Sequence, residues 1–311
     1  MIKNLIKIIS LLACIVMLFC CCKDVVLIEE YYSFTDDNNQ VVTLYSKPQK
    51  VAVLLSSFAE IWSLSGGKVD ITVGESVERG LCENTVLLVD NGAGKTINAE
   101  LLASYKPDFI IGSVDIAGHK EAYGVLKNSG APFCLMRVEN FNDYLRVLKI
   151  FCEINENTEA YKKYGEDLQI KIKALIEDAK NKKPSKVMFI RSGSSESSLK
   201  AKASSEHFAA AMLSELGAVN IADSAEILLD GLSHEEIIKQ NPKYIFVSLM
   251  GNEKAAKKLV NETFKKPEWQ VIDAIKNNKV IFLEKELFQY KPNQRFLKAY
   301  SFLNKALYGE N

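Results

Sequence analysis

The chain has 311 residues, of which 48% are hydrophobic and 25% are charged, and its 39 Lys and Arg residues balance its 39 Asp and Glu residues. This composition is typical of a globular protein, and the length suggests two domains. Because the formal net charge is zero, the chain lacks the overall basic field that attracts nucleic acid. We therefore expect no nucleic-acid partner.

The first 21 residues have the pattern of a lipoprotein signal peptide. Two early lysines precede an apolar run at 8–19, which is too short to span a bilayer comfortably. The run ends at three adjacent cysteines, and a leucine a few residues before a cysteine resembles the bacterial lipobox. Cys21, or alternatively Cys22, is predicted to carry a lipid that tethers the protein to the membrane outside the cytoplasm. The alternative is a cleaved signal peptide without a lipid.

The remaining cysteines do not suggest a disulfide framework. Cys82, Cys134 and Cys152 are odd in number and widely spaced. Cys134 lies in the strand-like run "APFCLM", where a small buried residue is expected.

Residues 22–46 are predicted to form a tether and a hairpin, because two β-prone runs flank "DDNN". Residues 47–140 then alternate apolar strands with helices that end on glycine, which indicates a parallel α/β lobe. The predicted strands lie at 51–56, 71–76, 86–90, 108–113 and 131–138, and the predicted helices at 58–67, 98–104 and 119–130.

The pattern changes in the interlobe linker, 141–183. From Thr158 to Asn181 apolar residues recur at intervals of three and four, and Gly165 is the one residue that disfavours a helix. Such a helix spans roughly 35 Å. A second α/β lobe is predicted at 184–311, with strands at 187–192, 244–249 and 279–284 and a last helix at 293–308. The predicted fold is thus α/β, two lobes with parallel sheets joined by one long rigid interdomain helix.

A short unit occurs twice, as "NAELLASYKPDFIIG" at 98–112 and "SHEEIIKQNPKYIFV" at 233–247. Glu100 and Glu235 occupy equivalent positions in the first turn of the two predicted helices. Asn98 and Ser233 are good N-cap residues, and Ser233 with Glu236 makes a capping box. An acidic residue in a first turn can simply complement the helix dipole. Two of them, one in each lobe, also suit a partner that offers two arginine-bearing pockets.

Over about residues 34–308 the chain resembles the cobalamin and iron-siderophore type of periplasmic solute-binding protein, the helical-backbone class that serves ABC importers. Segments that carry the resemblance include "ELLASYKPDFIIGS", "LSHEEIIKQNPKYIFVS" and "PEWQVIDAIKNNKVIFL", in that order. The resemblance implies a monomeric two-lobe clamp that captures a ferric siderophore, haem or cobalamin. It also implies permease and ATPase partners, location in the bacterial cell envelope, and docking of Glu100 and Glu235 onto permease arginines.

In open α/β sheets the ligand crevice lies at the carboxyl ends of the strands, so loops of both lobes are expected to line it. The candidate ligand-binding residues are Ser57, Phe58, Arg79, Arg191, His207, Phe288, Tyr290 and Arg295. The arginines suit carboxylate or catecholate oxygens, and the aromatic rings suit a flat or bulky ligand. Alternatively, each arginine could simply lie on the surface, and each aromatic ring could fill the core of its lobe.

Histidine is scarce, and His119, His207 and His234 show no metal-ligand spacing. We therefore expect neither a protein metal site nor a resident cofactor. We expect a ligand whose metal is already chelated when the protein binds it. His207 is a candidate axial ligand for haem, against a surface position on its helix.

Two other classes remain as alternatives, an exported hydrolase and a structural envelope protein. The Ser-rich stretch "RSGSSESS" has no nucleophile elbow, and no His and Asp are placed to complete a triad. We therefore predict that the protein is not an enzyme.

Overall fold

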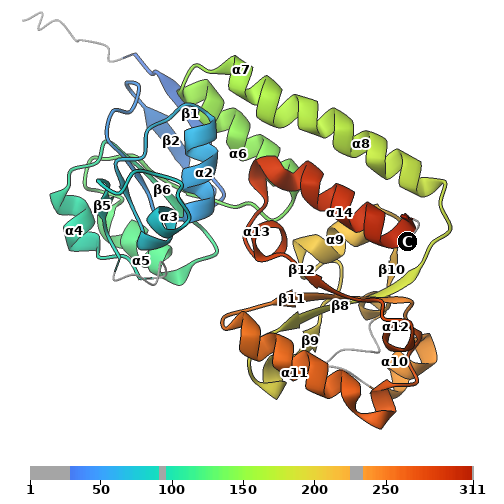
Figure 1. Cartoon of the computed structure of the whole chain (residues 1–311). Helices are drawn as coiled ribbons and strands as arrows, with labels where there is room; N and C mark the ends of the chain where they lie inside the picture. Colours follow the sequence, from blue (N-terminus) through green and yellow to red (C-terminus); the bar gives the residue numbers. More distant parts are fainter. Residues whose placement is uncertain (1–28, 91–95, 225–233, 310–311) are drawn as a thin grey trace, which may run out of the picture.

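The computed structural model describes residues 29–90, 96–224 and 234–309, which form two lobes connected by a helical segment (Figure 1). The predicted signal peptide and lipidation site lie outside these residues. Within the described part of the chain, no helix combines the length and the apolar character needed to cross a membrane.

A hairpin leads into the amino-terminal lobe, as the sequence predicts. Strands β1 (Tyr32–Thr35) and β2 (Val41–Leu44) pair in antiparallel register. The Asp36 carboxylate stabilises the turn, since one oxygen accepts two backbone N–H groups of the turn at 2.9 and 2.8 Å. Its other oxygen accepts the backbone N–H of Leu135 at 2.9 Å, so the same side chain fixes the hairpin to the lobe.

Five parallel strands form the sheet of the amino-terminal lobe, in the order β5-β4-β3-β6-β7. Their bounds are Val51–Val53 (β3), Ile71–Thr72 (β4), Leu87–Leu88 (β5), Phe109–Ser113 (β6) and Phe133–Met136 (β7). The flanking helices are Ser56–Leu64 (α2), Gly74–Glu78 (α3), Ala99–Ser104 (α4) and Ala117–Leu126 (α5). Successive strand residues alternate between two apolar clusters, because side chains of a strand point to opposite faces.

Helices make the connection between the lobes. Helix α6 (Phe141–Ile154) begins with a capping box between Asn140 and Asp143. After a short turn, α7 (Thr158–Tyr161), a π-helical segment (Lys162–Glu166) and α8 (Asp167–Lys180) follow one another without a gap. Figure 1 shows them as one rod that runs from the amino-terminal lobe along the other lobe.

The π-helical segment contains Gly165, the residue that the sequence marks as unfavourable for a helix. A Cβ atom at this position would lie 3.1 Å from the Tyr161 ring, so glycine permits the close contact there. The helix therefore continues through Gly165 with one wider turn.

Four parallel strands form the main sheet of the carboxy-terminal lobe, in the order β10-β8-β11-β12, and β9 pairs antiparallel with β8. Their bounds are Lys186–Ser192 (β8), Lys200–Ala201 (β9), Val219–Asn220 (β10), Tyr244–Leu249 (β11) and Val280–Leu283 (β12). The helices are Phe208–Glu215 (α9), His234–Gln240 (α10), Glu253–Lys265 (α11), Asp273–Lys276 (α12), Lys285–Phe288 (α13) and Phe296–Tyr308 (α14).

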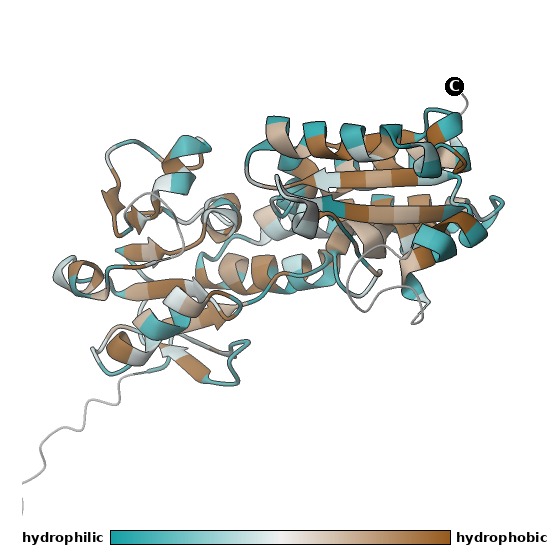
Figure 2. Ribbon diagram, turned by 90° about the horizontal axis from the view of Figure 1, so that it is seen from below, coloured by the Kyte–Doolittle hydropathy of each residue, from teal (hydrophilic) through white to brown (hydrophobic). Residues whose placement is uncertain are grey.

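One hydrophobic core cluster extends through both lobes and the helices between them. The ring of Trp62 on α2 lies 5.3 Å from Phe151 on α6, and Phe141 on α6 lies 5.2 Å from Phe296 on α14. Helix α6 thus contacts the cores of both lobes. Figure 2 shows the strands of both lobes mostly in the apolar colour, with polar residues on the outer sides of the helices.

The predicted strands and helices of both lobes are confirmed, apart from shifts at their ends and the strand predicted at 71–76, of which residues 74–76 form the start of α3. The boundaries proposed at 46/47, 140/141 and 183/184 each fall between secondary-structure elements. Helices α3, α11, α12 and α13 were not predicted. The expectation for Cys134 is confirmed, since its side chain is completely buried in the main cluster.

Candidate ligand-binding site

The two lobes meet at a buried polar contact centred on Glu60, a residue of α2 that the sequence analysis did not identify. Glu60 is only 5% exposed. Its carboxylate accepts hydrogen bonds from Nδ2 of Asn293 at 2.8 Å and from Nη2 of Arg295 at 3.1 Å, both from the segment after α13. Asn293 also donates to the backbone oxygen of Ser57 at 2.9 Å. These bonds join the start of α2 to the opposite lobe.

A second contact lies beside the first and involves Arg79. The Arg79 side chain, at the end of α3, is 7% exposed, and its guanidinium stacks 4.0 Å from the centroid of the Tyr290 ring. Its Nη1 donates to Oγ of Ser56 at 2.9 Å, and its Nη2 lies 3.9 and 3.8 Å from carboxylate oxygens of Glu60 and Glu286. A cation stacked on an aromatic ring with little water nearby is an attractive contact.

We call these residues, Ser57, Glu60, Arg79, Tyr290, Asn293 and Arg295, the interlobe junction. Four of them were predicted as ligand-binding residues, and the structure brings these four together from three segments: the start of α2, the end of α3 and the stretch after α13. In this structure they contact one another. Nε of Arg79, Nε of Arg295 and Oδ1 of Asn293 are buried without a hydrogen-bond partner among the described residues.

Two further predicted residues belong to a separate group in the carboxy-terminal lobe, formed by Arg191, His207 and Lys291. His207 is the N-cap of α9 and lies between the rings of Phe189 and Phe208, at 4.6 and 4.8 Å. Nζ of Lys291 lies 4.9 Å from the centroid of the same Phe208 ring. We call these three residues the cationic group.

Two members of the cationic group, His207 and Lys291, have lowered pKa values. Burial is the main cause that lowers the pKa of His207 to about 3, and the nearby cations, Arg191 first, lower it further. Burial also lowers the pKa of Lys291, and acidic residues led by Glu139 oppose that shift. Within the described residues, neither Arg191 nor Lys291 has a carboxylate within 4.0 Å, as no such ion pair forms. Among the described residues, the charges of Arg191 and Lys291 are therefore not matched by a direct ion pair.

The two predicted phenylalanines do not line a ligand surface. Phe58 and Phe288 are 2% and 0% exposed, and both pack in the main core cluster. Phe58 lies on the side of α2 that covers the sheet, and Phe288 lies 5.6 Å from Phe302 on α14. Both rings therefore fill the core of their own lobe, which corrects the expectation that they flank a ligand.

The repeated unit is confirmed as helix followed by strand in both lobes. Asn98 caps α4, since its side chain accepts the backbone N–H of Leu101 at 2.9 Å. Ser233, the second predicted N-cap, lies outside the described residues. Glu100 and Glu235 are both exposed, in the first turns of α4 and α10. Figure 1 shows these helices at the outer margins of their lobes.

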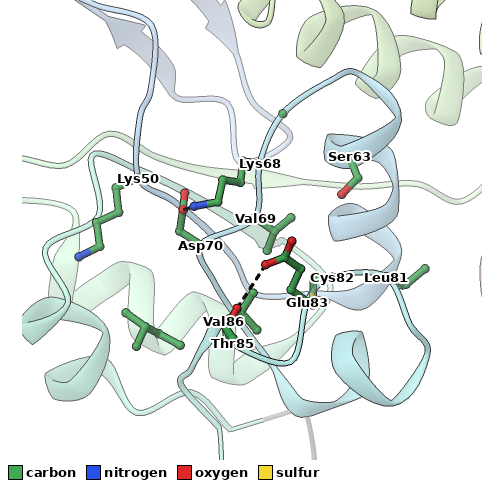
Figure 3. A pocket seen from close by; sticks show the side chains of 12 residues that line it. Lys50, Ser63, Lys68, Val69, Asp70, Leu81, Cys82, Glu83, Thr85 and Val86 are labelled. Atoms are coloured by element: carbon green, nitrogen blue, oxygen red, sulfur yellow. Dashed lines mark hydrogen bonds and ion pairs between the residues drawn. The ribbon is translucent and has the colours of Figure 1, made fainter.

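Several cavities lie away from the interlobe junction. A cavity of about 460 Å³ opens in the amino-terminal lobe beside β4 and β5 (Figure 3). Two of its charged residues, Lys68 and Asp70, form an ion pair at 2.5 Å. Among the residues that the structure describes, no three His, Cys, Asp or Glu side chains form a group that could hold a metal ion.

Sequence reasoning missed Glu60, Asn293 and Lys291. Glu60 gave a signal, because it is the one charged residue in the apolar helix "SSFAEIWSL", where a carboxylate needs a basic partner. The sequence does not reveal that partner, since Arg295 is 235 positions away along the chain.

Comparison with known proteins agrees with this architecture. A family model described as periplasmic binding protein matches residues 41–287. No curated protein matches the chain by sequence. Staphylococcus aureus SirA, solved with staphyloferrin B, superposes with a TM-score of 0.70 at 20% identity, covering 89% of this chain and 98% of its own.

Two further solved structures are similar. The vitamin B12 binding protein BtuF of Vibrio cholerae has a TM-score of 0.65 at 20% identity, covering 84% of this chain and 97% of its own. The heme-binding protein RhuT from Roseiflexus sp. RS-1 has a TM-score of 0.67 at 17% identity, covering 84% and 98%. At these identities the structures show a shared fold. Because the family model covers most of the chain, the protein belongs to the periplasmic binding protein family, a family of solute-binding proteins rather than enzymes.

Proposed function

We propose that the protein is the extracytoplasmic substrate-binding component of an ABC importer. It captures a metal chelate between its lobes and delivers it to the permease. The chelate is a ferric siderophore, haem or cobalamin. The observation that carries this proposal is the interlobe junction, because loops at the carboxyl ends of two parallel sheets face each other there. Similar structures are described as binding a siderophore, heme or vitamin B12.

The chelate is the cargo in this proposal, and the protein carries no resident cofactor. The metal arrives already coordinated, so the protein has to recognise the outer surface of a complex. Arginine and lysine side chains suit this task, since they bind carboxylate and catecholate oxygens without competing for the metal.

A ligand screen tests the proposed function. The full chain, purified in detergent, is heated with haem, cyanocobalamin, ferric citrate, a ferric tris-catecholate or a ferric tris-hydroxamate. A ligand present at 100 times its Kd raises the free energy of unfolding by about 2.7 kcal/mol, which gives a clear rise in melting temperature. If no member of this panel raises the melting temperature, the proposal is wrong.

Delivery requires contact with the permease, and Glu100 and Glu235 are the residues we propose for it. Both are exposed and lie on separate lobes, so they can meet two arginine-bearing pockets at once. We expect Glu100→Lys with Glu235→Lys to abolish uptake and leave the affinity for the ligand unchanged. Glu121→Lys with Glu262→Lys is the control, because it makes the same change of charge at exposed positions on other helices. Normal uptake in the first double variant would contradict the docking role.

We also propose that Cys21, or Cys22, carries the lipid that holds the protein at the outer face of the cytoplasmic membrane, and that the protein acts as a monomer. Mass spectrometry of the amino-terminal peptide checks the lipid. A peptide that begins at either cysteine and carries acyl chains is the expected result, and a mature chain without acyl chains would contradict it.

A further inference from the structure

We propose that the stacked side chains of Arg79 and Tyr290 form a gate, which closes the interlobe site in the ligand-free protein and separates to admit the ligand. The two residues belong to opposite lobes, with Arg79 at the end of α3 and Tyr290 shortly after α13. This inference rests on the proposed function, because it concerns how the ligand reaches its site. Its basis is a contact between the lobes that is close but poor in hydrogen bonds.

The Arg79 side chain is anchored to its own lobe. Nη1 donates to Oγ of Ser56 at 2.9 Å, and Oγ of Ser56 donates in turn to the carboxylate of Glu75. Because Ser56 is only 1% exposed, this relay is shielded from water. It fixes the guanidinium at the boundary of the amino-terminal lobe, from where it contacts the other lobe.

Across this boundary Arg79 makes a stacking contact but no short ion pair. Its guanidinium lies 4.0 Å from the centroid of the Tyr290 ring, and Nζ of Lys285 lies 5.1 Å from the same centroid. Nη2 of Arg79 is 3.9 Å from Glu60 and 3.8 Å from Glu286, which is beyond the reach of a hydrogen bond. The gate is therefore held mainly by attraction between a cation and an aromatic ring.

The closed gate leaves two donor atoms of Arg79 unused. Nε and Nη2 are buried and have no hydrogen-bond partner among the described residues, and the whole side chain is 7% exposed. Removing such donors from water without a partner is unfavourable, and this cost disappears when water reaches them. Opening of the gate thus restores interactions that the closed contact lacks.

The neighbouring contacts of Glu60 are of a different kind. Glu60 accepts hydrogen bonds of 2.8 Å from Asn293 and 3.1 Å from Arg295, and hydrogen bonds to a charged group are strong. Arg79 and Tyr290 can separate by rotation of their side chains while these bonds persist. The gate therefore opens without movement of one lobe relative to the other.

A gate of this kind limits the fraction of molecules that can bind ligand at any moment. The apparent affinity falls by that fraction, and association is slowed. Removal of the Tyr290 ring should therefore accelerate capture. Loss of a simple ligand contact has a different effect, because it mainly accelerates release.

Opening is measured first without ligand, by alkylation of a cysteine beneath the arginine. Ser56→Cys places a thiol where Oγ of Ser56 meets Arg79. The full chain in detergent is treated with iodoacetamide, and mass spectrometry follows the peptide that contains position 56. We expect Tyr290→Ala in this background to accelerate alkylation by roughly tenfold. Tyr290→Leu, which keeps most of the apolar volume, should also accelerate it.

Two controls keep the gate closed in the alkylation experiment. Tyr290→Phe retains the aromatic ring beside Arg79. Tyr164→Ala removes a ring whose centroid lies 4.8 Å from Nζ of Lys163, in the helical segment between the lobes. Each should change the alkylation rate by about twofold or less. Equal rates for Tyr290→Ala, Tyr290→Leu and the parent Ser56→Cys protein would overturn the gate.

Capture is then measured by stopped-flow mixing with whichever of haem, cyanocobalamin or ferric citrate raises the melting temperature, followed by protein fluorescence. We expect Tyr290→Leu to raise the association rate constant by roughly tenfold and Tyr164→Ala to leave it unchanged. An association rate constant that stays the same or falls in Tyr290→Leu would overturn the gate. If alkylation is accelerated but none of the probes binds, the closed contact is confirmed and the proposed function is contradicted.

Discussion

At the scale of single residues, Glu60 forms the hydrogen bonds that connect the two lobes. Its carboxylate is buried between the lobes and hydrogen-bonded to Asn293 and Arg295. A buried carboxylate of this kind fixes the relative position of its donors, because removal of one partner leaves the others buried without compensation. The junction therefore couples the stability of the fold to the geometry of the candidate binding surface.

We expect Glu60→Ala to lower the free energy of unfolding by about 3 kcal/mol, since the partly buried Arg295 and the buried Arg79 lose their carboxylate. Urea unfolding monitored by circular dichroism measures the change. The control is Glu284→Ala, whose partner Lys298 is exposed and 3.7 Å away, and which should cost about 0.5 kcal/mol or less. Equal effects of the two substitutions would show that the junction contributes nothing beyond a surface ion pair.

His207 makes stability depend on pH in a defined window. Its pKa in the folded protein is about 3, and in the unfolded chain it is about 6.5. Between these values the unfolded chain binds the proton and the folded protein does not. Stability from this residue is therefore complete above pH 6.5 and is lost as pH falls toward 3.

We expect wild-type protein to lose up to about 1 kcal/mol per pH unit from this source between pH 6 and 4. His207→Asn should show a flatter curve, because asparagine keeps the cap and does not titrate. Thermal melts of both proteins across this range, compared with their difference at pH 8, give the measurement. Parallel curves would mean that burial does not lower the pKa of His207 in the folded protein.

At the scale of elements, the turn after α2 shows how closely the amino-terminal lobe is packed. The indole N–H of Trp62 donates to the backbone oxygen of Lys68 at 2.8 Å, and the chain passes directly beside the ring. A Cβ atom on Gly67 would lie 2.2 Å from the Trp62 ring. Only glycine fits there without movement of a fully buried tryptophan.

Two glycine substitutions with opposite expected effects test this description. Gly67→Ala should destabilise the protein by about 2 kcal/mol, because the Trp62 ring has to shift in a packed core. Gly124→Ala should stabilise it by about 0.5–1 kcal/mol, since Gly124 lies exposed in α5 with open space around it. Chemical denaturation measures both, and a neutral Gly67→Ala would show that the turn tolerates movement of the ring.

At the scale of the whole molecule, three features oppose a large hinge motion. Helical residues run from Thr158 to Lys180 without a gap, one core cluster extends through both lobes, and the interlobe junction adds hydrogen bonds between the lobes. A hinge needs a few loop residues that absorb the change in backbone angles. A hinge motion would also break the hydrogen bonds that Glu60 accepts from the opposite lobe.

We therefore predict that the two lobes keep their relative position when a ligand binds. Small-angle X-ray scattering profiles of the protein alone and with a saturating amount of haem, cyanocobalamin or ferric citrate, whichever stabilises it, should superimpose. Glu60→Ala should allow a measurable difference between the two states, because it removes the carboxylate that Asn293 and Arg295 contact across the lobes. Marked compaction of the wild-type protein with ligand would contradict the prediction.

Local signals in the sequence determined the elements and their order. Apolar runs bounded by glycine and proline predicted the strands of both sheets, and the intervals of three and four predicted the helix from Thr158 onward. The repeated unit predicted equivalent helices carrying Glu100 and Glu235. These predictions succeeded because periodicity, caps and turn residues act over a few positions of the chain.

Only the tertiary structure decided which side chains share a site. Phe58 and Phe288 are aromatic residues of a type that often contacts ligands, but they fill the core. Glu60 and Lys291 contact residues that lie far away in the sequence. Arg79 and Tyr290 remain predicted ligand contacts, and the sequence did not reveal that they contact each other. The physical reason is that burial and pairing depend on how the two lobes face each other, and no local pattern of residues encodes that arrangement.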